Sequence, residues 1–582
     1  MENLKYSDIL RLNKEIQDKV VELPSYDIAV LSNIITSQLN EILEYTLRIQ
    51  NINAKVKSGD YDNLLENSSR FSNSKLVIVF FESANFVDGF QYKSNLFEER
   101  ECSEIIAKVK MEIDILFENL KSTSLVIFNK FSSLVFNHNF IRTNNYDRIC
   151  NELNKYLEEK LPSNVVLFDI DKIVAKISIK KSVDFRYYYS SKALYTIEFY
   201  KKYSQFIKPI IMSVMGKVKK VLIFDCDNTL WKGVLGEDGF NGIEMAGKTK
   251  GGVVFEEVQS LGLNLSKRGV LIGLCSKNNP EEIENVIDNH PDMTFRNSNL
   301  SIKKVNWDNK LANIQSIAKE LNIGLDSVVF VDDSDFEVGL IKDYLKEVTV
   351  LKVPTNSYEY PMMFRENMQL FYSISETKED LLRVEMYKNQ VQRENDQTSH
   401  DTLNSYLNSL ELVMRIKLND NENVPRIAQL TQKTNQFNLT TKRYTESDIN
   451  EFLKNNDYSI FSFEVADKYG DAGLTGVAIL RVDKLKNLAI IDSLLMSCRI
   501  IGRSLELAFF DFLVEHLKKN GIVSINASYI KTLKNEQVCD LYQKLGFTII
   551  DNSKVESVYR LNLADYNFQN INYIKINHGR EN

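Results

Sequence analysis

A short apolar segment, Val221–Phe224, runs directly into two aspartates, Asp225 and Asp227, and then into Thr229. Consecutive β-forming apolar residues are typical of a strand that is buried on both faces, as in a parallel sheet. The two carboxylates therefore stand at the carboxyl end of that strand. Open α/β sheets bind their ligands at this edge, so the segment predicts both a fold class and the position of a chemical site.

At 582 residues, the chain is long enough for roughly three to four domains, each with its own core. With 43% hydrophobic and 26% charged residues, its composition is that of an ordinary globular protein. The 72 basic and 79 acidic residues leave a net charge of −7, which gives no electrostatic reason to expect a nucleic-acid partner. No apolar run approaches the ~18 residues of a membrane span, and the first residues lack the apolar region of a signal peptide. We therefore expect a cytoplasmic protein without a membrane partner.

The six cysteines are widely spaced and form no Cys-x-x-Cys pair. This pattern favours neither a disulfide framework nor a zinc site, and it fits a reducing compartment. Cys226 lies between the two aspartates.

Strand-like apolar runs alternate with amphipathic helical stretches over residues 1–216 and again over residues 217–368, which predicts a parallel sheet in each block. The clearest runs lie at 28–31, 76–81, 124–128 and 164–168 in the first block, and at 221–224, 270–274 and 328–331 in the second.

Beyond residue 368 the pattern changes. Residues 369–409 include a charged, helix-favouring segment at 377–398 and are predicted to form a helical connector. Residues 410–582 combine strand-like runs at 476–480 and 488–491 with an amphipathic helix pattern at 504–518, which predicts a mixed α+β domain. The chain is thus expected to be a multidomain α/β protein.

The aspartates of the second block are suited to phosphoryl transfer. The Asp225 carboxylate can attack phosphorus and form an aspartyl-phosphate, which splits one difficult displacement into two easier ones. Asp227 lies two residues on and can protonate the leaving-group oxygen and then activate water. Ser276, at the end of another strand-like run, offers a hydroxyl and a backbone N–H to the phosphoryl oxygens, and Lys310 offers positive charge.

A metal ion is expected at the same place. Two aspartates this close repel each other unless a cation lies between them, and hard oxygen ligands suit Mg²⁺. A further ligand should come from another strand end, where Asp332 and Asp333 follow an apolar run. We predict a Mg²⁺ site formed by Asp225, Asp227, Asp332 and Asp333, and the sequence leaves open which of the last two contacts the metal directly.

The order of nucleophile, hydroxyl, lysine and acidic pair resembles the haloacid-dehalogenase (HAD) superfamily of phosphohydrolases, and this resemblance implies a Rossmann-like parallel sheet. The intervals from Asp225 to Ser276 and from Ser276 to Lys310 are largely consumed by the connecting sheet elements, so no sizeable cap domain fits there. An uncapped site is open, which suits a phosphorylated substrate that is large or tethered to a carrier protein.

In the third block, Arg499, Gly502, Arg503 and Ser504 form an Arg-x-x-Gly-x-small turn that follows a predicted strand and opens a predicted helix. Such a turn aims backbone N–H groups and a helix N-terminus at an anion such as the pyrophosphate of coenzyme A. The turn therefore predicts an anion-binding site.

This turn and the later segment 535–547 resemble those of GNAT acetyltransferases. The resemblance implies a site for coenzyme A or carrier-bound phosphopantetheine that includes Asn535, with Tyr542 protonating the leaving thiolate. The alternative is a fold kept for packing, or for docking a pantetheine-bearing carrier, with Tyr542 simply in the core. The sequence does not decide between the two.

The first block resembles the SGNH-hydrolase fold but lacks its Gly-Asp-Ser nucleophile motif. Ser32 stands near the first strand, but no histidine follows Asp184, so a Ser-His-Asp triad cannot be assembled. His138 is interpreted as a surface or capping residue. We expect a non-catalytic domain, and esterase activity that is abolished in Ser32→Ala would overturn this expectation.

Longer strings in the second and third blocks resemble the FkbH-like family, also described as class IIIC HAD proteins. They lie at 225–231 with Gly233 and 236–239, at 275–278, 306–307, 321–324 and 330–333, and at 428–431, 433–438 and 497–499. The resemblance covers most of the chain. Cys226 stands where this family more usually has leucine, so the resemblance implies that it is a core residue.

The FkbH-like resemblance implies a Mg²⁺-dependent enzyme that takes a glyceryl unit from 1,3-bisphosphoglycerate, removes phosphate and delivers glycerate as a thioester to an acyl carrier protein for polyketide-type pathways. Transfer from an acyl phosphate to a carrier thiol can pass through an enzyme cysteine, since a thiolate is a good acyl acceptor. Cys498, beside Arg499 and near a helix start, is the candidate.

Two other functions remain open. The same residues would serve a phosphatase fused to an acetyl-CoA-dependent acyltransferase in polysaccharide or other secondary biosynthesis. A carrier-docking scaffold with degenerate sites is the non-enzymatic alternative. The intact set of predicted HAD-type residues argues against this scaffold.

Overall fold

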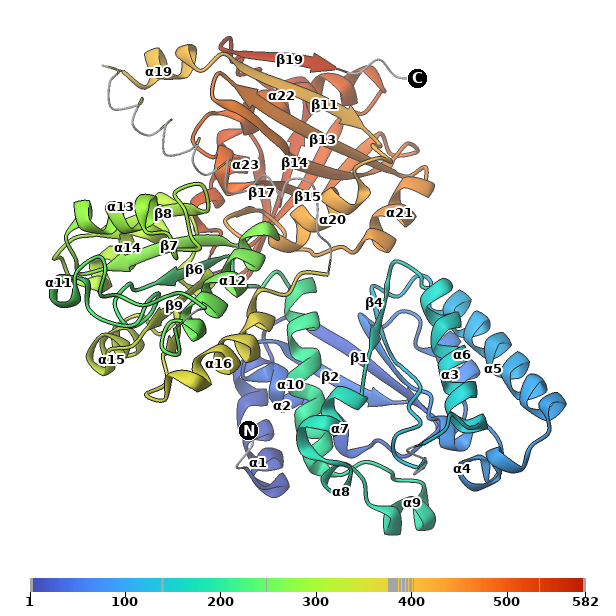
Figure 1. The fold of residues 1–582 in the computed structure, drawn as a ribbon. Coiled ribbons are helices and arrows are strands. Elements are labelled where there is room, and N and C mark those ends of the chain that lie inside the picture. The colour runs from blue at the N-terminus through green and yellow to red at the C-terminus, as the bar shows by residue number, and fades with distance from the viewer. Residues whose placement is uncertain are drawn as a thin grey trace. The chain divides into compact units, whose positions relative to one another are not determined.

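The computed structural model describes residues 4–137, 141–247, 249–374, 402–532 and 534–578, together with Met386, Asn389, Arg393, Asp396 and His400. Figure 1 shows the elements in chain order. Most of the predicted connector helix at 377–398 lies outside the described residues, and so does His138.

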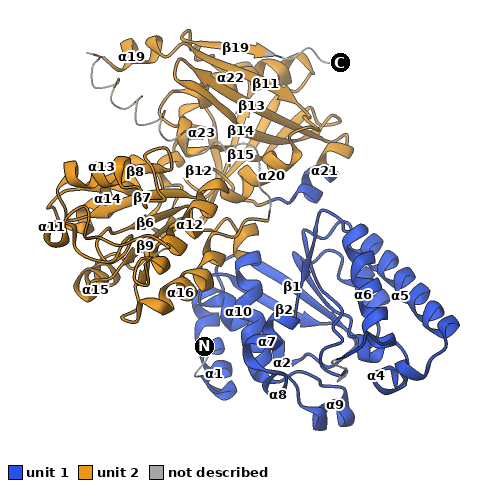
Figure 2. Ribbon diagram, viewed as in Figure 1, with its two compact units in different colours: residues 1–211, 444–451 blue, residues 212–443, 452–582 orange. Residues whose placement is uncertain are grey.

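The chain divides into two compact units by its internal contacts (Figure 2). Residues 1–211 and the short segment 444–451 form the first unit, and residues 212–443 and 452–582 form the second. The second and third sequence blocks therefore share one unit, apart from 444–451. The finer division into four segments remains a prediction.

The first unit contains a five-stranded parallel sheet with the order β2-β1-β3-β4-β5. Its central strands are buried, as expected for continuous apolar runs between helical layers. The strands are β1 (Ser25–Ser32), β2 (Asn53–Ser58), β3 (Leu76–Phe80), β4 (Leu125–Asn129) and β5 (Val165–Phe168). The helices are α1 (Tyr6–Val20), α2 (Gln38–Arg48), α3 (Leu64–Arg70), α4 (Phe90–Lys93), α5 (Glu99–Asn119), α6 (Asn145–Glu159), α7 (Asp171–Ile177), α8 (Ile179–Ser182), α9 (Phe185–Ser191) and α10 (Ile197–Val214), which ends just beyond the unit.

The candidate SGNH-type positions in this unit have structural roles. Ser32 is buried, and its Oγ accepts a hydrogen bond from the backbone N–H of Ile34 at 3.0 Å. Asp184 precedes α9, and its carboxylate accepts bonds from the backbone and side chain of Arg186. The parallel α/β sheet is confirmed, whereas the specific SGNH-like assignment remains a prediction.

The second unit begins with another five-stranded parallel sheet, of order β10-β9-β6-β7-β8. From the central strand β6 (Val221–Phe224) the chain first moves to β7 and β8 and then to β9 and β10 on the other side, so the strand order reverses at the carboxyl end of β6. The other strands are β7 (Leu271–Ser276), β8 (Leu300–Val305), β9 (Val328–Asp332) and β10 (Thr349–Lys352).

Helices cover both faces of this sheet, and two apolar clusters lie between the helices and the strands. The helices are α11 (Leu235–Asp238), α12 (Val253–Lys267), α13 (Pro280–Asn289), α14 (Lys310–Glu320), α15 (Asp335–Tyr344) and α16 (Tyr360–Asn367). Between β6 and β7 the described residues form α11, α12 and an isolated bridge between Lys232 and Glu244, and between β7 and β8 they form α13. These described connections contain no cap domain.

The rest of the second unit is built on a mixed sheet of order β17-β18-β16-β15-β14-β13-β11-β19, with β12 pairing to β15. Its strands are β11 (Leu412–Leu418), β12 (Phe437–Asn438), β13 (Tyr458–Asp467), β14 (Gly470–Asp483), β15 (Leu488–Met496), β16 (Ser524–Ile530), β17 (Thr548–Asn552), β18 (Glu556–Asn562) and β19 (Ile574–His578). Its helices are α19 (Leu403–Ser409), α20 (Val424–Lys433), α21 (Glu446–Lys454), which begins within the first unit, α22 (Leu505–Lys519) and α23 (Leu541–Lys544). The predicted mixed α+β character is confirmed.

Strands β15 and β16 run parallel but pair only over their first residues, 488–491 with 524–527. Beyond that point β15 pairs with β12, in the register Phe437 to Met496. The backbone N–H of Ile530, at the end of β16, donates to the Leu439 carbonyl at 2.8 Å. Residues 437–439 therefore lie between the diverging ends of the two strands.

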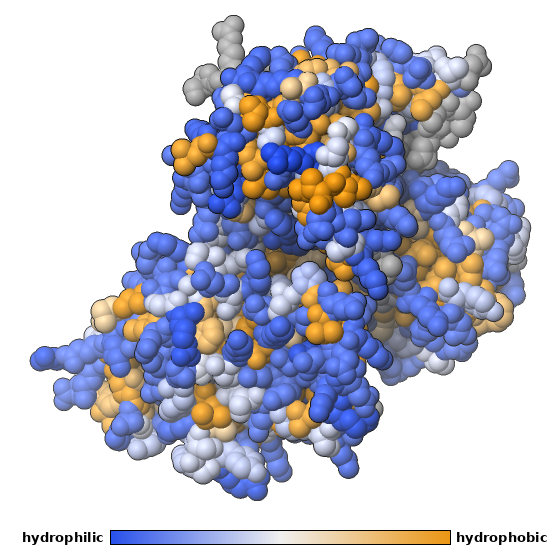
Figure 3. All heavy atoms as spheres, turned by 180° about the vertical axis from the view of Figure 1, so that it is seen from behind, coloured by the Kyte–Doolittle hydropathy of each residue, from blue (hydrophilic) through white to orange (hydrophobic). Residues whose placement is uncertain are grey.

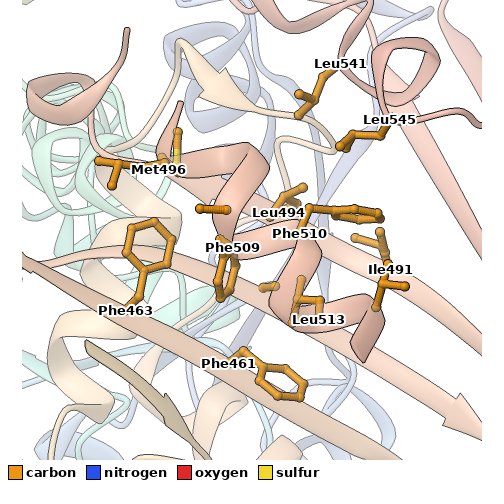
Figure 4. Packing of buried hydrophobic residues seen from close by; sticks show 14 of the residues in the cluster. Phe461, Phe463, Ile491, Leu494, Met496, Phe509, Phe510, Leu513, Leu541 and Leu545 are labelled. Carbon is orange, nitrogen blue, oxygen red and sulfur yellow. The ribbon is translucent and has the colours of Figure 1, made fainter. Parts of the chain in front are cut away.

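Hydrophilic residues cover most of the face seen in Figure 3, where hydrophobic residues appear in small groups. Large apolar side chains are packed inside instead. In Figure 4, Phe509, Phe510 and Leu513 of α22 point into a cluster with Phe461 and Phe463 from β13. Among the described residues, no helix combines the length and apolar character needed to cross a membrane.

Candidate functional site

The carboxyl edge of the second parallel sheet gathers charged side chains from three connections. Asp225 follows β6, Asp332 ends β9, and Lys310 begins α14 after β8. The Lys310 ammonium lies 2.8 Å from Asp225 Oδ1 and 2.7 Å from Asp332 Oδ2. All three side chains are buried, with Asp225 5% exposed and Asp332 fully enclosed. The structure thus brings together three of the residues predicted from strand ends.

Ser276 and Asp227 are linked to this edge through a side chain that was not predicted. The Asn278 amide donates to Asp227 Oδ2 at 2.8 Å and to Ser276 Oγ at 3.2 Å. The other carboxylate oxygen of Asp227 accepts bonds from the Trp231 indole at 3.0 Å and from the Leu235 N–H at 2.9 Å. Asp227 is therefore held in one orientation at the rim of the site.

Three carboxylates could hold a metal ion. Asp225, Asp332 and Asp333 each offer an oxygen, and these oxygens all lie within 4.8 Å of one another. Oxygen ligands of this kind suit a hard cation such as Mg²⁺. The Asp227 side chain, which was also predicted as a ligand, is not part of this cluster because its oxygens accept the hydrogen bonds that fix its orientation.

Burial makes negative charge costly at this edge. Burial raises the pKa of the Asp225 carboxyl to about 6, although Lys310 opposes the shift. Burial also raises the pKa of Asp332 and that of Asp333. For Lys310, burial favours a lower pKa, but the attraction of Asp225 and Asp332 outweighs it and raises the pKa above its usual value. Three carboxylates share the charge of one lysine, so the donor set fits an additional divalent cation.

Sequence reasoning missed Asn278 and Trp231 as parts of the site. Both lie within strings that were singled out for their family resemblance, 275–278 and 225–231. Asn278 could have been recognised in the sequence, because it is a polar residue two positions after Ser276, which ends a predicted strand. The role of Trp231 depends on how the chain turns after Asp227, which spacing does not reveal.

The predicted anion-binding turn in the mixed domain has the expected backbone. Gly502 has φ +87° and Ser504 has φ +56°, and the chain then enters α22. The buried Arg503 guanidinium, however, lies 3.1 Å from Asp467 Oδ2 and donates to the Arg499 carbonyl at 3.0 Å. Arg499 itself donates to the Ser497 hydroxyl at 3.2 Å. Arg503 is thus engaged in an internal ion pair.

The Asn535 side chain, predicted as a cofactor contact, is fully enclosed. Its amide nitrogen donates to the carbonyls of Asn438 and Ile530, each at 2.9 Å. Its oxygen accepts bonds from the hydroxyl and backbone N–H of Thr532. These bonds give Asn535 a structural role, tying β12 to the end of β16.

The Tyr542 side chain lies in the apolar core, where its ring packs against Phe547 and Tyr559. Its hydroxyl is buried and has no hydrogen-bond partner in the described part of the chain. Burial raises the pKa of this hydroxyl far above its usual value. Of the two interpretations left open by the sequence, this position favours the core residue over the proton donor.

The two cysteines singled out in the sequence differ in accessibility. Cys226 is fully buried beneath the aspartates. Cys498 is half-buried in the short helical turn after β15, and its carbonyl accepts a bond from the Asn322 side chain at 2.8 Å. Cys498 is therefore the accessible thiol of this pair.

Comparison with solved structures shows which folds the chain shares. The crystal structure of the N-terminal part of the protein BF1531 from Bacteroides fragilis, described as containing a phosphatase domain complexed with Mg, matches with a TM-score of 0.57 and 24% identity over 64% of this chain and 100% of that one. The two chains therefore share a fold over that region.

Solved acetyltransferases match a smaller part of the chain. The ribosomal-protein-S18-alanine N-acetyltransferase from Escherichia coli has a TM-score of 0.21 and 15% identity over 26% of this chain and 94% of that one. A PaiA N-acetyltransferase from Thermoplasma acidophilum in complex with coenzyme A has a TM-score of 0.18 and 16% identity over 20% of this chain and 72% of that one. These scores are too low to support an argument. No protein-family model matches the chain, and no curated protein matches it.

Lys310→Met should destabilise the metal-free protein by about 3–5 kcal/mol, because two buried carboxylates lose their cationic partner. Added Mg²⁺ should recover part of this loss if the carboxylates bind it. Urea unfolding with and without Mg²⁺ measures both effects. Lys232→Met, which removes only an exposed pair with Glu244, is the control, and an equal loss in both variants would contradict the interpretation.

Tyr542→Phe should leave the unfolding midpoint unchanged or raise it, because the substitution removes a buried hydroxyl without a partner. Tyr566→Phe is the matched control, since the Tyr566 hydroxyl donates to Asp511 at 2.6 Å and its removal should cost about 1 kcal/mol. Thermal melts of both variants make the comparison. A clear loss of stability in Tyr542→Phe would show that its hydroxyl has a partner.

Proposed function

We propose that the protein is a Mg²⁺-dependent phosphatase whose carboxyl-edge site works through an aspartyl-phosphate on Asp225. The observation that carries this proposal is the buried contact of Lys310 with both Asp225 and Asp332. It joins a candidate nucleophile, a cation and a candidate metal ligand from three separate connections of the sheet. The fold shared with the BF1531 phosphatase-domain structure supports it.

In the first step an Asp225 oxygen attacks phosphorus, and the bond from phosphorus to the leaving oxygen breaks. Asp227 protonates that oxygen, and in the second step it takes a proton from the water that hydrolyses the aspartyl-phosphate. Ser276 and Lys310 donate to the phosphoryl oxygens as their charge changes. Mg²⁺ bound by Asp225, Asp332 and Asp333 would supply further positive charge to those oxygens.

The resemblance of the strings after β6, β7 and β15 to the FkbH-like family supports a more specific proposal. The phosphorylated substrate is a glyceryl unit from 1,3-bisphosphoglycerate, which is loaded as a thioester on an acyl carrier protein. The Cys498 sulfur adds to the acyl carbon, the bond from that carbon to the phosphate oxygen breaks, and phosphate leaves with the electron pair and accepts the thiol proton. Exchange with the carrier thiol then regenerates Cys498.

A second candidate is a phosphatase fused to an acetyl-CoA-dependent acyltransferase. The backbone of the turn at Gly502 and Ser504 favours it, since left-handed residues at a helix start can present N–H groups to a pyrophosphate. The internal bonds of Arg503 and Asn535 disfavour it, because these two predicted contacts already have partners. We therefore place it second.

Asp225→Asn should lower phosphate release from a phosphate monoester such as p-nitrophenyl phosphate by roughly 10³-fold or more, because the amide cannot form the aspartyl-phosphate. Initial rates in Mg²⁺ measure the effect, with circular dichroism to verify folding. Asp335→Asn, at an exposed position nearby, should retain activity. Equal activity of Asp225→Asn and wild type would exclude Asp225 as the nucleophile.

The glyceryl-transfer proposal is tested on a phosphopantetheinylated acyl carrier protein incubated with the enzyme, Mg²⁺ and 1,3-bisphosphoglycerate. Intact-mass spectrometry should reveal a glyceryl adduct on the carrier and should reveal none with Cys498→Ala. An acyl-enzyme that persists in Cys498→Ala would reject the role of this cysteine. Absence of the adduct with several carriers, but acetyl transfer from acetyl-CoA, would favour the second candidate.

A further inference from the structure

A cavity of about 330 Å³ lies within the second unit, between the parallel sheet and the mixed domain. From the parallel sheet it is lined by residues that precede or begin strands, including Lys220 before β6 and Ser327 before β9. From the mixed domain it is lined by Cys498 and its neighbours. The cavity therefore lies at the amino edge of the sheet, whereas Asp225 and Asp332 lie at the carboxyl edge.

Three strings that the phosphatase site leaves unused meet at this cavity. They are 321–324 in the connection before β9, 433–438 at the end of α20, and 497–499 after β15. Direct bonds join the last two strings to the parallel-sheet domain: Asn322 donates to the Cys498 carbonyl at 2.8 Å, and Lys220 donates to the Lys433 carbonyl at 2.9 Å. Segments far apart in sequence thus line one pocket, and Cys498 is among the lining residues.

The charge of the lining is mainly positive. Lys220, Arg426, Lys433, Arg499 and Lys534 line the cavity, against the carboxylates of Asp326 and Glu347. The Lys534 ammonium contacts the Asp326 carboxylate, so these two opposite charges partly cancel each other. Cationic side chains from two domains that line one pocket of this volume favour an anion of small size.

We propose that this cavity is a second anion-binding site, one that holds a small phosphorylated molecule beside the Cys498 thiol. The inference rests on the proposed function, and it deepens that function by giving acyl transfer a site of its own. A phosphate group would share the lining cations with the backbone carbonyls that they already contact, since Lys220 donates to the Lys433 carbonyl and Arg426 to the Leu474 carbonyl. The volume is that of a small metabolite rather than of a macromolecule.

Two lysines next to the lining support this proposal. Burial lowers the pKa of Lys217 and that of Lys219 to about 8, and the charge of Lys534 contributes to both shifts. A bound anion would stabilise the charged form of these lysines, so binding and protonation should reinforce each other.

The position of the cavity also separates the two chemical steps. The strands between the edges span four to six residues, so Asp225 and the lining at Lys220 are roughly 15 Å apart. One small molecule cannot contact both sites. A phosphorylated acyl group that is first transferred to Cys498, then exchanged onto the carrier thiol with release of the Cys498 thiol, would move to Asp225 for dephosphorylation on the flexible arm of carrier-bound phosphopantetheine.

The test is the rate at which iodoacetamide alkylates Cys498, followed by peptide mass spectrometry. Inorganic phosphate and 3-phosphoglycerate are the probes, and sodium chloride at matched ionic strength is the control. Cys539, which is exposed, serves as an internal reference in the same protein. At about ten times the dissociation constant, either probe should slow alkylation of Cys498 about tenfold and leave Cys539 unchanged.

Lys534→Ala should weaken the protection, because it removes one lining cation, whereas Lys531→Ala, at an exposed position nearby, should not. Asp225→Asn should retain the protection, since the phosphatase site lies at the other edge. Failure of both probes to give saturable protection, or equal protection by chloride, overturns the inference. Phosphate release without protection would reject this site alone, and protection without phosphate release would reject the proposed phosphatase.

Discussion

The ammonium of Lys310 between the carboxylates of Asp225 and Asp332 is the interaction on which the carboxyl-edge site depends. Each carboxylate ends a buried strand or follows it, and bringing two such strands side by side puts negative charges together in a place that water does not reach. The Lys310 ammonium compensates for these negative charges, because the first turn of α14 places it in contact with both carboxylates. The excess of carboxylate oxygens makes burial of this site unfavourable in free energy. The same oxygens make the site suitable for a metal ion.

The parallel topology places the two candidate sites at opposite edges of the sheet. At the carboxyl edge the strand ends supply acidic residues, a hydroxyl and a lysine, and the described connections leave the site without a cap. At the amino edge the same sheet and the mixed domain line a pocket that has mainly cationic residues and includes Cys498. Because strands have a fixed rise per residue, the two edges cannot approach each other, and under the proposed function a carrier-bound substrate would have to travel between them.

Much of the carboxyl-edge site could be predicted from the sequence. Asp225, Ser276 and Asp332 follow or end apolar strand-forming runs, and parallel strands put their carboxyl ends at one edge, so local pattern and topology together bring them near each other. Asn278 and Trp231 were missed because their roles depend on turns after the strands. In the mixed domain, the turn at Gly502 was recognisable, but the internal partners of Arg503 and Asn535 come from segments far away in the chain.

By itself, the sequence determined the alternation of strands and helices, the parallel sheets and the order of the candidate phosphoryl-transfer residues, because these depend on short-range periodicity and on where a strand ends. Only the tertiary structure decided that Asp227 lies outside the carboxylate cluster, that Tyr542 is a core residue, and that residues of the strings 321–324, 433–438 and 497–499 line one pocket. These outcomes depend on contacts between residues distant in sequence, and a local pattern carries no information about which distant side chain fills a given space.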